Sequence, residues 1–193
     1  LLNSLVGEKV SIVSRKAHTN QMNTNGVITK DNSQLIFFDT PGLNKIEKNI
    51  RITETFKTVA ENVDVLIYMV DNTKKSQSID DQFRNWLNNN ENKFRKKILI
   101  INKIDCIEKV NLFEITKKIN GVINFDETFF ISLSKKSGME RFLNWVEKQA
   151  YSDEWLFQQT YKSNISKKNF LSELTREKIF EYIHEEIPYN LEI

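Results

Sequence analysis

The 193-residue chain carries 28 Lys and Arg residues against 26 Asp and Glu residues, so its formal net charge is only +2. Hydrophobic residues make up 39% of the sequence, which is enough to fill the core of one domain with a remainder. Five Gly and two Pro residues exclude an extended disordered or collagen-like chain. The single cysteine, Cys106, excludes an internal disulfide and favours a reducing compartment such as the cytosol.

Charge and hydropathy exclude further classes. No apolar run approaches the roughly 20 residues that a membrane-spanning helix needs, and no signal peptide is expected. Residues 1–150 are net basic and residues 151–193 net acidic, which suits an anionic partner for the first part. The sequence begins with Leu1 rather than Met, which predicts that the true start lies upstream.

The first elements are a helix end and a hairpin. Leu1, Leu2 and Leu5 have helical spacing, and Gly7 is placed to end that helix in the left-handed conformation. Residues 14–25 are polar and aperiodic, which predicts a loop. Residues 26–30 and 34–39 flank Asp-Asn-Ser, so the sequence predicts a β-hairpin there.

The second hairpin strand ends in a polar turn. Residues 35–38 are consecutive large apolar residues, a pattern typical of a strand covered on both faces. Asp39-Thr40-Pro41-Gly42 stops this strand and delivers a carboxylate to its C-terminal end. Asp39 is therefore a candidate ligand for hydrated Mg²⁺ beside a phosphate, and Gly42 would let a backbone amide approach that phosphate. The alternative is an ordinary turn.

Strands and helices then alternate up to residue 150. After a charged loop, the sequence predicts helices at residues 50–62, 79–90, 110–119 and 139–150, and buried strands at 63–70, 97–101 and 128–131. Leu112, Phe113 and Ile115 are expected to face inward in the third of these helices. This alternation predicts an α/β fold with a parallel sheet covered by helices on both faces.

The C-terminal part changes character. Residues 151–168 lack steady periodicity and are interpreted as a linker packed partly on the domain. Ser166 is a candidate N-cap for a helix that runs to Glu186, and Pro188 ends it.

Three polar turns each follow a predicted buried strand, at residues 39–42, 102–105 and 134–136, so they are expected to meet at one edge of the sheet. Asn102 can donate a hydrogen bond to a purine N7, and the Lys103 stem can lie over the ring. Asp105 offers two acceptor oxygens to adjacent N–H donors, an edge that guanine has and adenine lacks. Ser134 can brace Asp105, while the amides of Lys135 and Lys136 can face the carbonyl oxygen of the base.

These motifs resemble a known family. Asp39-Thr40-Pro41-Gly42, then Asn102-Lys103-Ile104-Asp105, then Ser134 resemble the third, fourth and fifth motifs of translation-factor-related GTPases. Residues 14–19, Ser-Arg-Lys-Ala-His-Thr, resemble the switch I loop of the bacterial ribosome-assembly GTPases of the Era family. Residues 172–178 and 186–189 resemble the junction where that family enters its RNA-binding KH domain.

The resemblance implies a fold, ligands and partners. It implies a P-loop NTPase-like three-layer α/β/α domain with a mostly parallel sheet at residues 1–150, a linker at 151–168 and the beginning of a KH-type α+β domain at 169–193. Its cofactors would be GTP or GDP and Mg²⁺, and its partners small-subunit ribosomal RNA and the ribosomal subunit. A monomer is expected, located in the cytoplasm or peripherally at the inner membrane. The implied nucleotide contacts are Asp39, Thr40, Pro41, Gly42, Leu43, Asn102, Lys103, Ile104, Asp105, Ser134, Lys135 and Lys136, and the implied metal ligands are Asp39 and Thr19.

The sequence also departs from the family pattern. The Gly-rich phosphate loop and the strand before it would precede Leu1, so this chain is expected to be an inactive or weakly binding fragment. Thr19 is followed by Asn20, where the family has a second threonine. This difference weakens the expectation that this loop coordinates the metal. Leu43 stands where some GTPases place a water-orienting glutamine, and no catalytic residue can be named. The Gly-x-x-Gly loop of a KH domain is not in this sequence.

Two alternatives stay open. One is another cytosolic GTPase related to ribosomes or tRNA, which would differ in its C-terminal extension. The other, from a different class, is a pseudo-GTPase that acts as an interaction module without nucleotide.

Overall fold

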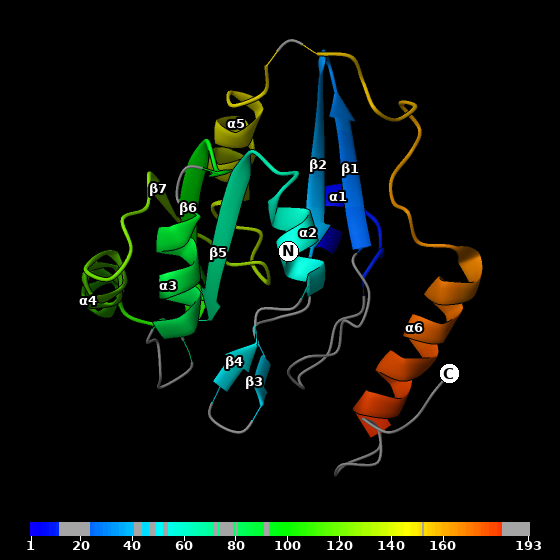
Figure 1. Cartoon of the computed structure of the whole chain (residues 1–193). Coiled ribbons are helices and arrows are strands. Elements are labelled where there is room, and N and C mark those ends of the chain that lie inside the picture. Colours follow the sequence, from blue (N-terminus) through cyan, green and yellow to red (C-terminus); the bar gives the residue numbers. More distant parts are fainter. Residues whose placement is uncertain are drawn as a thin grey trace. The chain divides into compact units, whose positions relative to one another are not determined.

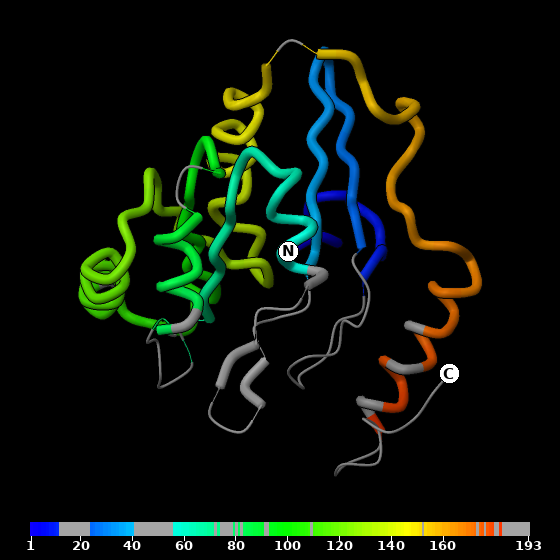
Figure 2. The backbone as a smooth tube through the Cα atoms, viewed as in Figure 1, coloured from blue at the N-terminus to red at the C-terminus, as the bar shows by residue number. Residues whose placement is uncertain are grey.

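The computed structural model describes residues 1–11, 24–40, 44–46, 49–51, 54–71, 73, 79, 81–90, 93–151 and 153–182. The chain forms two compact units, one made of residues 1–44 with 150–193 and the other of residues 45–149. Figure 2 follows the backbone through both units from the N-terminus to the C-terminus.

A parallel sheet forms the centre of the second unit. Its strands are β5 (Val65–Asp71), β6 (Lys96–Asn102) and β7 (Glu127–Phe130), and β6 lies between the other two. Tyr68 pairs with Leu99 and Leu99 with Thr128, both in parallel register. All three strands therefore end at the same edge, as the alternation of strands and helices predicts (Figure 1).

The central strand is buried on both faces. Ile98, Leu99, Ile100 and Ile101 have no exposed side-chain surface, although their side chains alternate between the two faces of the sheet. A continuous apolar run is the pattern of such a strand because helices cover it on both sides. At about 1.5–3 kcal/mol for each fully buried aliphatic side chain, this run contributes much of the hydrophobic stabilisation of the unit.

Helices α3 (Asp81–Asn89) and α5 (Met139–Glu147) cover opposite faces of this sheet (Figure 1). On one face, Tyr68 of β5 stacks on Phe83 of α3 with ring centroids 5.1 Å apart. On the other face, the Phe129 ring of β7 meets Phe142 of α5 at 5.5 Å. Thr128 lies in the same row of the sheet as Tyr68, because both are in register with Leu99. Phe129 is the next residue along β7, so its ring points to the face opposite the Tyr68 ring. This unit is therefore a three-layer α/β/α structure.

Two further helices belong to the same unit, α2 (Glu54–Ala60) and α4 (Lys109–Asn120). The Phe56 ring of α2 meets the Trp86 ring of α3 at 5.0 Å in an edge-to-face contact. Helix α4 buries Ile119, which is 1% exposed. Both helices thus contribute apolar side chains to the unit.

Helix α1 (Leu2–Val6) and an antiparallel hairpin organise the first unit. The hairpin joins β1 (Thr24–Lys30) to β2 (Ser33–Asp39), as predicted, and pairs the first residue of β1 with the last residue of β2. Gly26 allows α1 to approach β1 closely, because a Cβ there would lie 2.5 Å from Leu2 Cδ1. Gly7 ends α1 with φ 79°, which confirms its predicted left-handed role.

The segment after residue 150 is bound to this hairpin by side-chain amides that imitate strand pairing. Gln34 Nε2 donates to the Phe157 carbonyl at 2.9 Å, and the Phe157 N–H donates to Gln34 Oε1 at 3.0 Å. Asn25 and Asn164 exchange the same kind of bonds, each backbone N–H donating to the other side-chain oxygen at 3.0 and 2.8 Å. Residues 157–164 are therefore part of the first unit.

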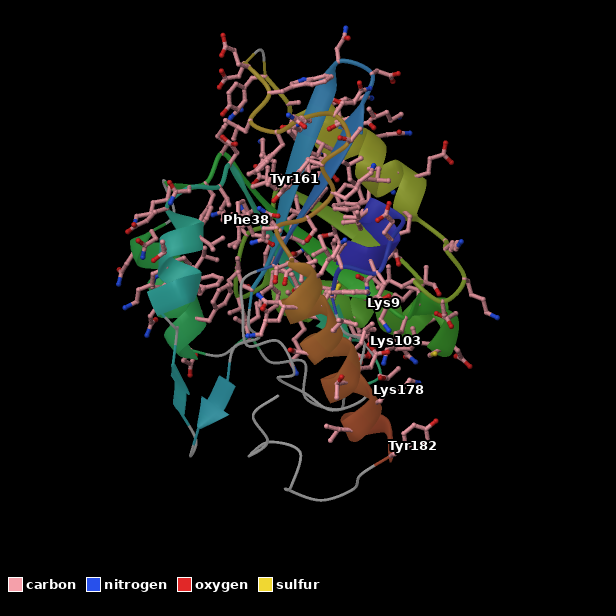
Figure 3. All side chains as sticks on the ribbon, turned by 90° about the vertical axis from the view of Figure 1, so that its right-hand side faces the viewer. Lys9, Phe38, Lys103, Tyr161, Lys178 and Tyr182 are labelled. Carbon is pink, nitrogen blue, oxygen red and sulfur yellow. The ribbon has the colours of Figure 1, made fainter. Side chains whose placement is uncertain are left out.

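Helix α6 (Lys167–Tyr182) follows this segment and begins as predicted. The Ser166 hydroxyl accepts the Asn169 N–H at 3.1 Å, which is the bond of an N-cap. Lys178 and Tyr182 lie near the end of the helix, with the ammonium 5.8 Å from the ring centroid (Figure 3). The predicted extension to Glu186 and the stop at Pro188 fall outside the described residues.

Three local predictions are wrong. Residues 44–51 contain a short strand pair, β3 (Asn44–Ile46) and β4 (Asn49–Arg51), where a loop and a helix starting at Ile50 were predicted. The β-branched residues Ile46 and Ile50 favour a strand there, and α2 begins only at Glu54.

Two exposed aromatic residues account for the other errors. Phe113 is 72% exposed, because Leu112, Ile115 and Ile119 form the inward stripe of α4 and Phe113 lies about 100° away from Leu112. Phe38 is 40% exposed, whereas Leu35 is buried, because β2 belongs to a hairpin and alternates between its two faces.

No helix in the described segments has both the length and the apolar character needed to cross a membrane.

Gly138 and Gly7 provide a matched test of backbone crowding. Both have left-handed φ values, 78° and 79°, but a Cβ at Gly138 would lie 2.2 Å from the Phe130 carbonyl oxygen, while a Cβ at Gly7 would meet nothing within 4 Å. We expect Gly7→Ala to lower the free energy of unfolding by about 1 kcal/mol, which is the conformational cost alone. Gly138→Ala should lower it by about 3 kcal/mol or more, because backbone must also move.

Urea unfolding followed by circular dichroism and tryptophan fluorescence measures both variants. Equal losses for the two substitutions would contradict the crowding at Gly138.

Candidate functional site

The polar residues of the second unit gather where its parallel strands end. Asp71 is the last residue of β5 and pairs in register with Asn102, the last residue of β6. Lys103, Ile104 and Asp105 follow directly, and the loop after β7 lies beside them. Carboxyl ends of parallel strands are the usual position of ligand sites in open α/β sheets.

Two hydrogen bonds connect the turn after β6 to the loop after β7. Asn102 Oδ1 accepts the Leu133 N–H at 3.3 Å, and the Ile104 N–H donates to the Ile131 carbonyl at 3.3 Å. The bond at Asn102 uses the oxygen of its amide, so the NH₂ group is the part of this side chain that can donate to an acceptor such as a purine N7. The two predicted turns at residues 102–105 and 134–136 are thus brought together.

Asp105 is an exposed carboxylate held by hydroxyl groups. The predicted brace from Ser134 is present, since its Oγ donates to Asp105 Oδ2 at 3.1 Å. Hydrogen bonding from Ser132 is the largest cause that holds the pKa of Asp105 below its ordinary value. The backbone N–H of Asp105, Ser134 and Cys106 lower this pKa further, and together these bonds outweigh desolvation, which raises it. Asp105 is therefore an anion with two acceptor oxygens at neutral pH.

The loop after β7 is itself rigidly tied. Ser132 and Ser137 exchange backbone hydrogen bonds, both 3.0 Å long. Ser132 is 1% exposed, and its Oγ accepts the Lys135 N–H at 3.1 Å and bonds to Ser134 Oγ at 3.0 Å. The Lys135 amide thus already has an acceptor, which a base carbonyl would have to share or replace. Lys136 adopts a left-handed φ of 53°.

Lys103 also has a left-handed conformation, with φ 61° and ψ 39°. Its Nζ lies 2.7 Å from Asp71 Oδ2 in an ion pair, and Figure 3 labels this lysine. The turn that follows β6 is therefore held on one flank by Asp71 and on the other by the serine hydroxyls of the β7 loop.

The first unit positions Asp39, the residue expected to bind a metal. Ser11 Oγ donates to Asp39 Oδ2 at 3.0 Å. Asn3 orients Ser11, because Asn3 Oδ1 accepts the N–H groups of Val10 and Ser11 at 2.8 Å each and Asn3 Nδ2 donates to the Ser11 carbonyl at 2.7 Å. A carboxylate beside a hydroxyl offers the hard oxygen ligands that Mg²⁺ prefers, so the residues present fit that ion.

Several predicted site residues lie elsewhere or outside the described part. Thr40 follows β2 directly, whereas Thr19, Pro41, Gly42 and Leu43 fall outside the described residues. Asp39 belongs to the first unit and Asp105 to the second. Convergence of all three turns thus stays a prediction, while convergence of the two turns within the second unit is observed.

Sequence reasoning missed Ser11, Asp71 and Ser132 as site residues. Asp71 carried a signal, because it is a polar residue that ends a predicted buried strand on the same sheet edge as Asn102. Ser11 and Ser132 carried none, since their roles depend on hydroxyl contacts with distant carboxylates.

Comparison with known proteins adds independent information. The sequence model of a family described as "50S ribosome-binding GTPase" matches residues 1–103. GTPase Era of Sinorhizobium medicae is 30% identical over 191 residues, which cover 98% of this chain and 61% of that protein. The GTP-binding protein ERG of Arabidopsis thaliana is 32% identical over 203 residues, which cover all of this chain and 46% of that protein.

Solved structures agree with the relatives. A crystal structure of Era in complex with MgGDPNP and nucleotides 1506–1542 of 16S ribosomal RNA has a TM-score of 0.80 at 29% identity, covering 97% of this chain and 64% of that chain. An Era variant from Aquifex aeolicus bound to GDP and AlF₄⁻ has a TM-score of 0.79 at 27% identity, covering 97% of this chain and 64% of that chain. The chain thus spans about three-fifths of the length of these Era proteins.

Replacing Ser132 should release the carboxylate of Asp105. We expect Ser132→Ala to raise the pKa of Asp105 toward its ordinary value, because the hydroxyl is the largest cause of the lowered pKa. Since that pKa is lowered in the folded state, these bonds stabilise the fold above the ordinary pKa of Asp, and this contribution disappears as the pH falls through the lowered pKa. Carboxyl NMR titration measures the shift. Ser137→Ala, which keeps the backbone pair, is the control and should leave the pKa of Asp105 unchanged.

Proposed function

Because this chain belongs to the GTPase family described as ribosome-binding, and Era GTPases are its homologues over 98% of its length, we propose that its gene product is a guanine nucleotide switch. It binds GTP and GDP together with Mg²⁺ and hydrolyses the γ-phosphate. It couples this cycle to assembly of the small ribosomal subunit through ribosomal RNA. The single observation that carries the nucleotide assignment is the braced, anionic Asp105 beside Asn102 and Lys103.

The base preference follows from hydrogen-bonding capacity. Guanine presents N1–H and the N2 amino group side by side, and Asp105 presents two acceptor oxygens. Adenine offers no such pair of donors, so the Asp105 carboxylate would face a base edge that cannot donate to it. A binding site built around such a group discriminates against adenine, because the carboxylate gives up water on binding without gaining donors in exchange.

The metal and phosphate functions are assigned to the first unit. Asp39, at the end of β2, would hold hydrated Mg²⁺, with Thr19 as a second ligand, and residues 40–43 would approach the phosphates. When bound, Mg²⁺ neutralises charge on the phosphate oxygens. The support in this chain is the orientation of the Asp39 carboxylate by Ser11. Ile104, Lys135 and Lys136 complete the proposed nucleotide contacts.

The ribosomal role is supported by the extent of the Era match. The family model covers residues 1–103 only, whereas the Era alignments and the Era complex with 16S ribosomal RNA cover 97–98% of the chain. Their coverage therefore includes the linker at residues 151–168 and the start of the proposed KH domain at 169–193. A cytoplasmic monomer, with peripheral association at the inner membrane as an additional state, completes the proposal.

A second candidate is a GTPase that acts on the large subunit, which the words "50S ribosome-binding" in the family description favour. Both candidates share the nucleotide site and differ in the ribosomal particle that they bind.

Asp105→Asn should exchange the nucleotide preference. The amide turns one acceptor of Asp105 into a donor, which opposes the guanine amino group and matches the carbonyl that xanthine has at that position. We expect the complete gene product to lose roughly 100-fold or more in affinity for GDP and to gain affinity for XDP. Isothermal titration calorimetry measures both nucleotides. Asp81→Asn on α3, whose side chain is 80% exposed, is the charge-matched control. Tighter binding of ADP than GDP by the unaltered protein would refute the proposal.

Sedimentation separates the two ribosomal candidates. We expect the complete gene product, loaded with a GTP analogue, to co-sediment with the small subunit and to be released when it is loaded with GDP. Co-sedimentation with the large subunit alone would favour the second candidate. Absence of nucleotide binding would support a pseudo-GTPase.

A further inference from the structure

The Lys103 ammonium is anchored to a residue on the neighbouring strand. Lys103 Nζ and Asp71 Oδ2 are 2.7 Å apart. The two residues come from separate strands, but Asp71 pairs in register with Asn102, the residue just before Lys103. The ion pair therefore spans the ends of β5 and β6 at the edge where Asn102 and Asp105 also lie.

Asp71 is itself held in place by Thr73. Its second oxygen, Oδ1, accepts the Thr73 N–H at 3.0 Å and the Thr73 hydroxyl at 2.6 Å. The bond from the Thr73 N–H to the Asp71 side chain forms an Asx-turn, in which an Asp side chain accepts a backbone N–H two residues further along the chain. One carboxylate oxygen is thus fixed by Thr73, and the other is directed at Lys103.

The carboxyl group of Asp71 carries a negative charge. Burial raises the pKa of Asp71, but hydrogen bonds from Lys103 and Thr73 lower it more, so the carboxyl group is ionised at neutral pH. The side chains of Lys103 and Asp71 are 47% and 25% exposed. The pair is therefore accessible to a ligand at the sheet edge and is partly screened by solvent.

From this geometry we propose that Asp71 is a positioning residue for guanine nucleotide binding, which acts by holding the Lys103 side chain as a platform for the face of the base. The inference rests on the proposed function and assigns Asp71 a part in the same site. Asp71 touches Lys103 and not the nucleotide.

The physical reason is the flexibility of lysine. A lysine side chain has four rotatable bonds, and ordering it when a ligand binds lowers the affinity. Lys103 also carries a left-handed backbone, which is unfavourable for a residue with a Cβ. An anchor at the ammonium orders the stem before the ligand arrives and helps to maintain the left-handed turn.

A positioning role of this kind can be recognised from the affinities for GDP and IDP. Contact with the face of a purine does not depend on the groups at its edge, so loss of the platform should weaken GDP and IDP by the same factor. Asp105, in contrast, reads the edge, and its replacement should change the ratio between these nucleotides. The GDP-to-IDP affinity ratio therefore distinguishes Asp71 from an edge-reading residue.

The test compares variants of the complete gene product by calorimetry with GDP and IDP. We expect Asp71→Asn to weaken both nucleotides by about three- to ten-fold, the range of a partly exposed ion pair and its ordering effect. Thr73→Val should give a smaller loss of the same kind, and Thr73→Ser, which keeps the hydroxyl, should restore the affinity. The control is Asp64→Asn, which removes the same charge just before β5, where the ion pair with Arg95 is 4.0 Å long.

Salt supplies a second readout. At about 1 M salt the Debye length is only about 3 Å, so the partly exposed ion pair is weakened in the unaltered protein. The difference between the unaltered protein and Asp71→Asn should therefore become smaller at high salt, while the ratio for Asp64→Asn stays near one-fold at every salt concentration.

Each outcome decides the inference. Unchanged GDP affinity in Asp71→Asn, in a protein that binds GDP, overturns the positioning role and leaves the proposed function standing. An altered GDP-to-IDP ratio, or an equal loss in Asp64→Asn, overturns it as well. If the unaltered protein binds no guanine nucleotide, the proposed function fails and the inference fails with it. Should Asp71→Asn not fold, the Thr73→Val and Thr73→Ser pair decides.

Discussion

Parallel pairing of β5, β6 and β7 is the constraint on which the rest of the second unit depends. The carboxyl ends of parallel strands lie at the same edge of a sheet. A polar residue at the end of one strand therefore lies beside the polar residues that follow the neighbouring strands. Burial of Ile98 to Ile101 opposes a slip of β6, because a shift along the strand would carry the polar residue Asn102 into the interior in place of Ile101. The position of Asp71, Asn102 and the β7 loop at one edge follows from that burial.

The same edge stores backbone strain. Three non-glycine residues among the described segments have positive φ, and two of them, Lys103 and Lys136, lie in the turns at this edge. Such conformations cost about 1–3 kcal/mol each and persist where surrounding contacts over-determine them. The Asp71 ion pair at Lys103 and the backbone pair between Ser132 and Ser137, which encloses Lys136, are contacts of this type. Strain and its restraints therefore coincide with the residues assigned to the nucleotide.

Sequence patterns predicted the features that depend on local chemistry. Continuous apolar runs predicted the parallel strands, and Ser166 predicted an N-cap. The position of polar turns after strands predicted the part of the site formed by residues 102–105 and 134–136. The errors arose where tertiary context decides. Phe113 is apolar but lies on the outer side of α4, and three-residue strands such as β3 are too short to show a period. The bonds from Ser11 to Asp39 and from Lys103 to Asp71 join residues distant in sequence, which no local pattern encodes.

Protection of a strand edge explains why the first unit includes chain from both ends of the sequence. β1 would otherwise present unpaired backbone groups along its outer side, a position that invites pairing with other chains. Residues 162–164 occupy it, since the Val27 N–H donates to the Lys162 carbonyl at 2.8 Å and Gly26 forms a bridge with Ser163. Composition places a linker at residues 151–168, but a linker that satisfies backbone groups of β1 cannot detach without exposing them. The segment leading to α6 is therefore a structural part of the unit that positions Asp39.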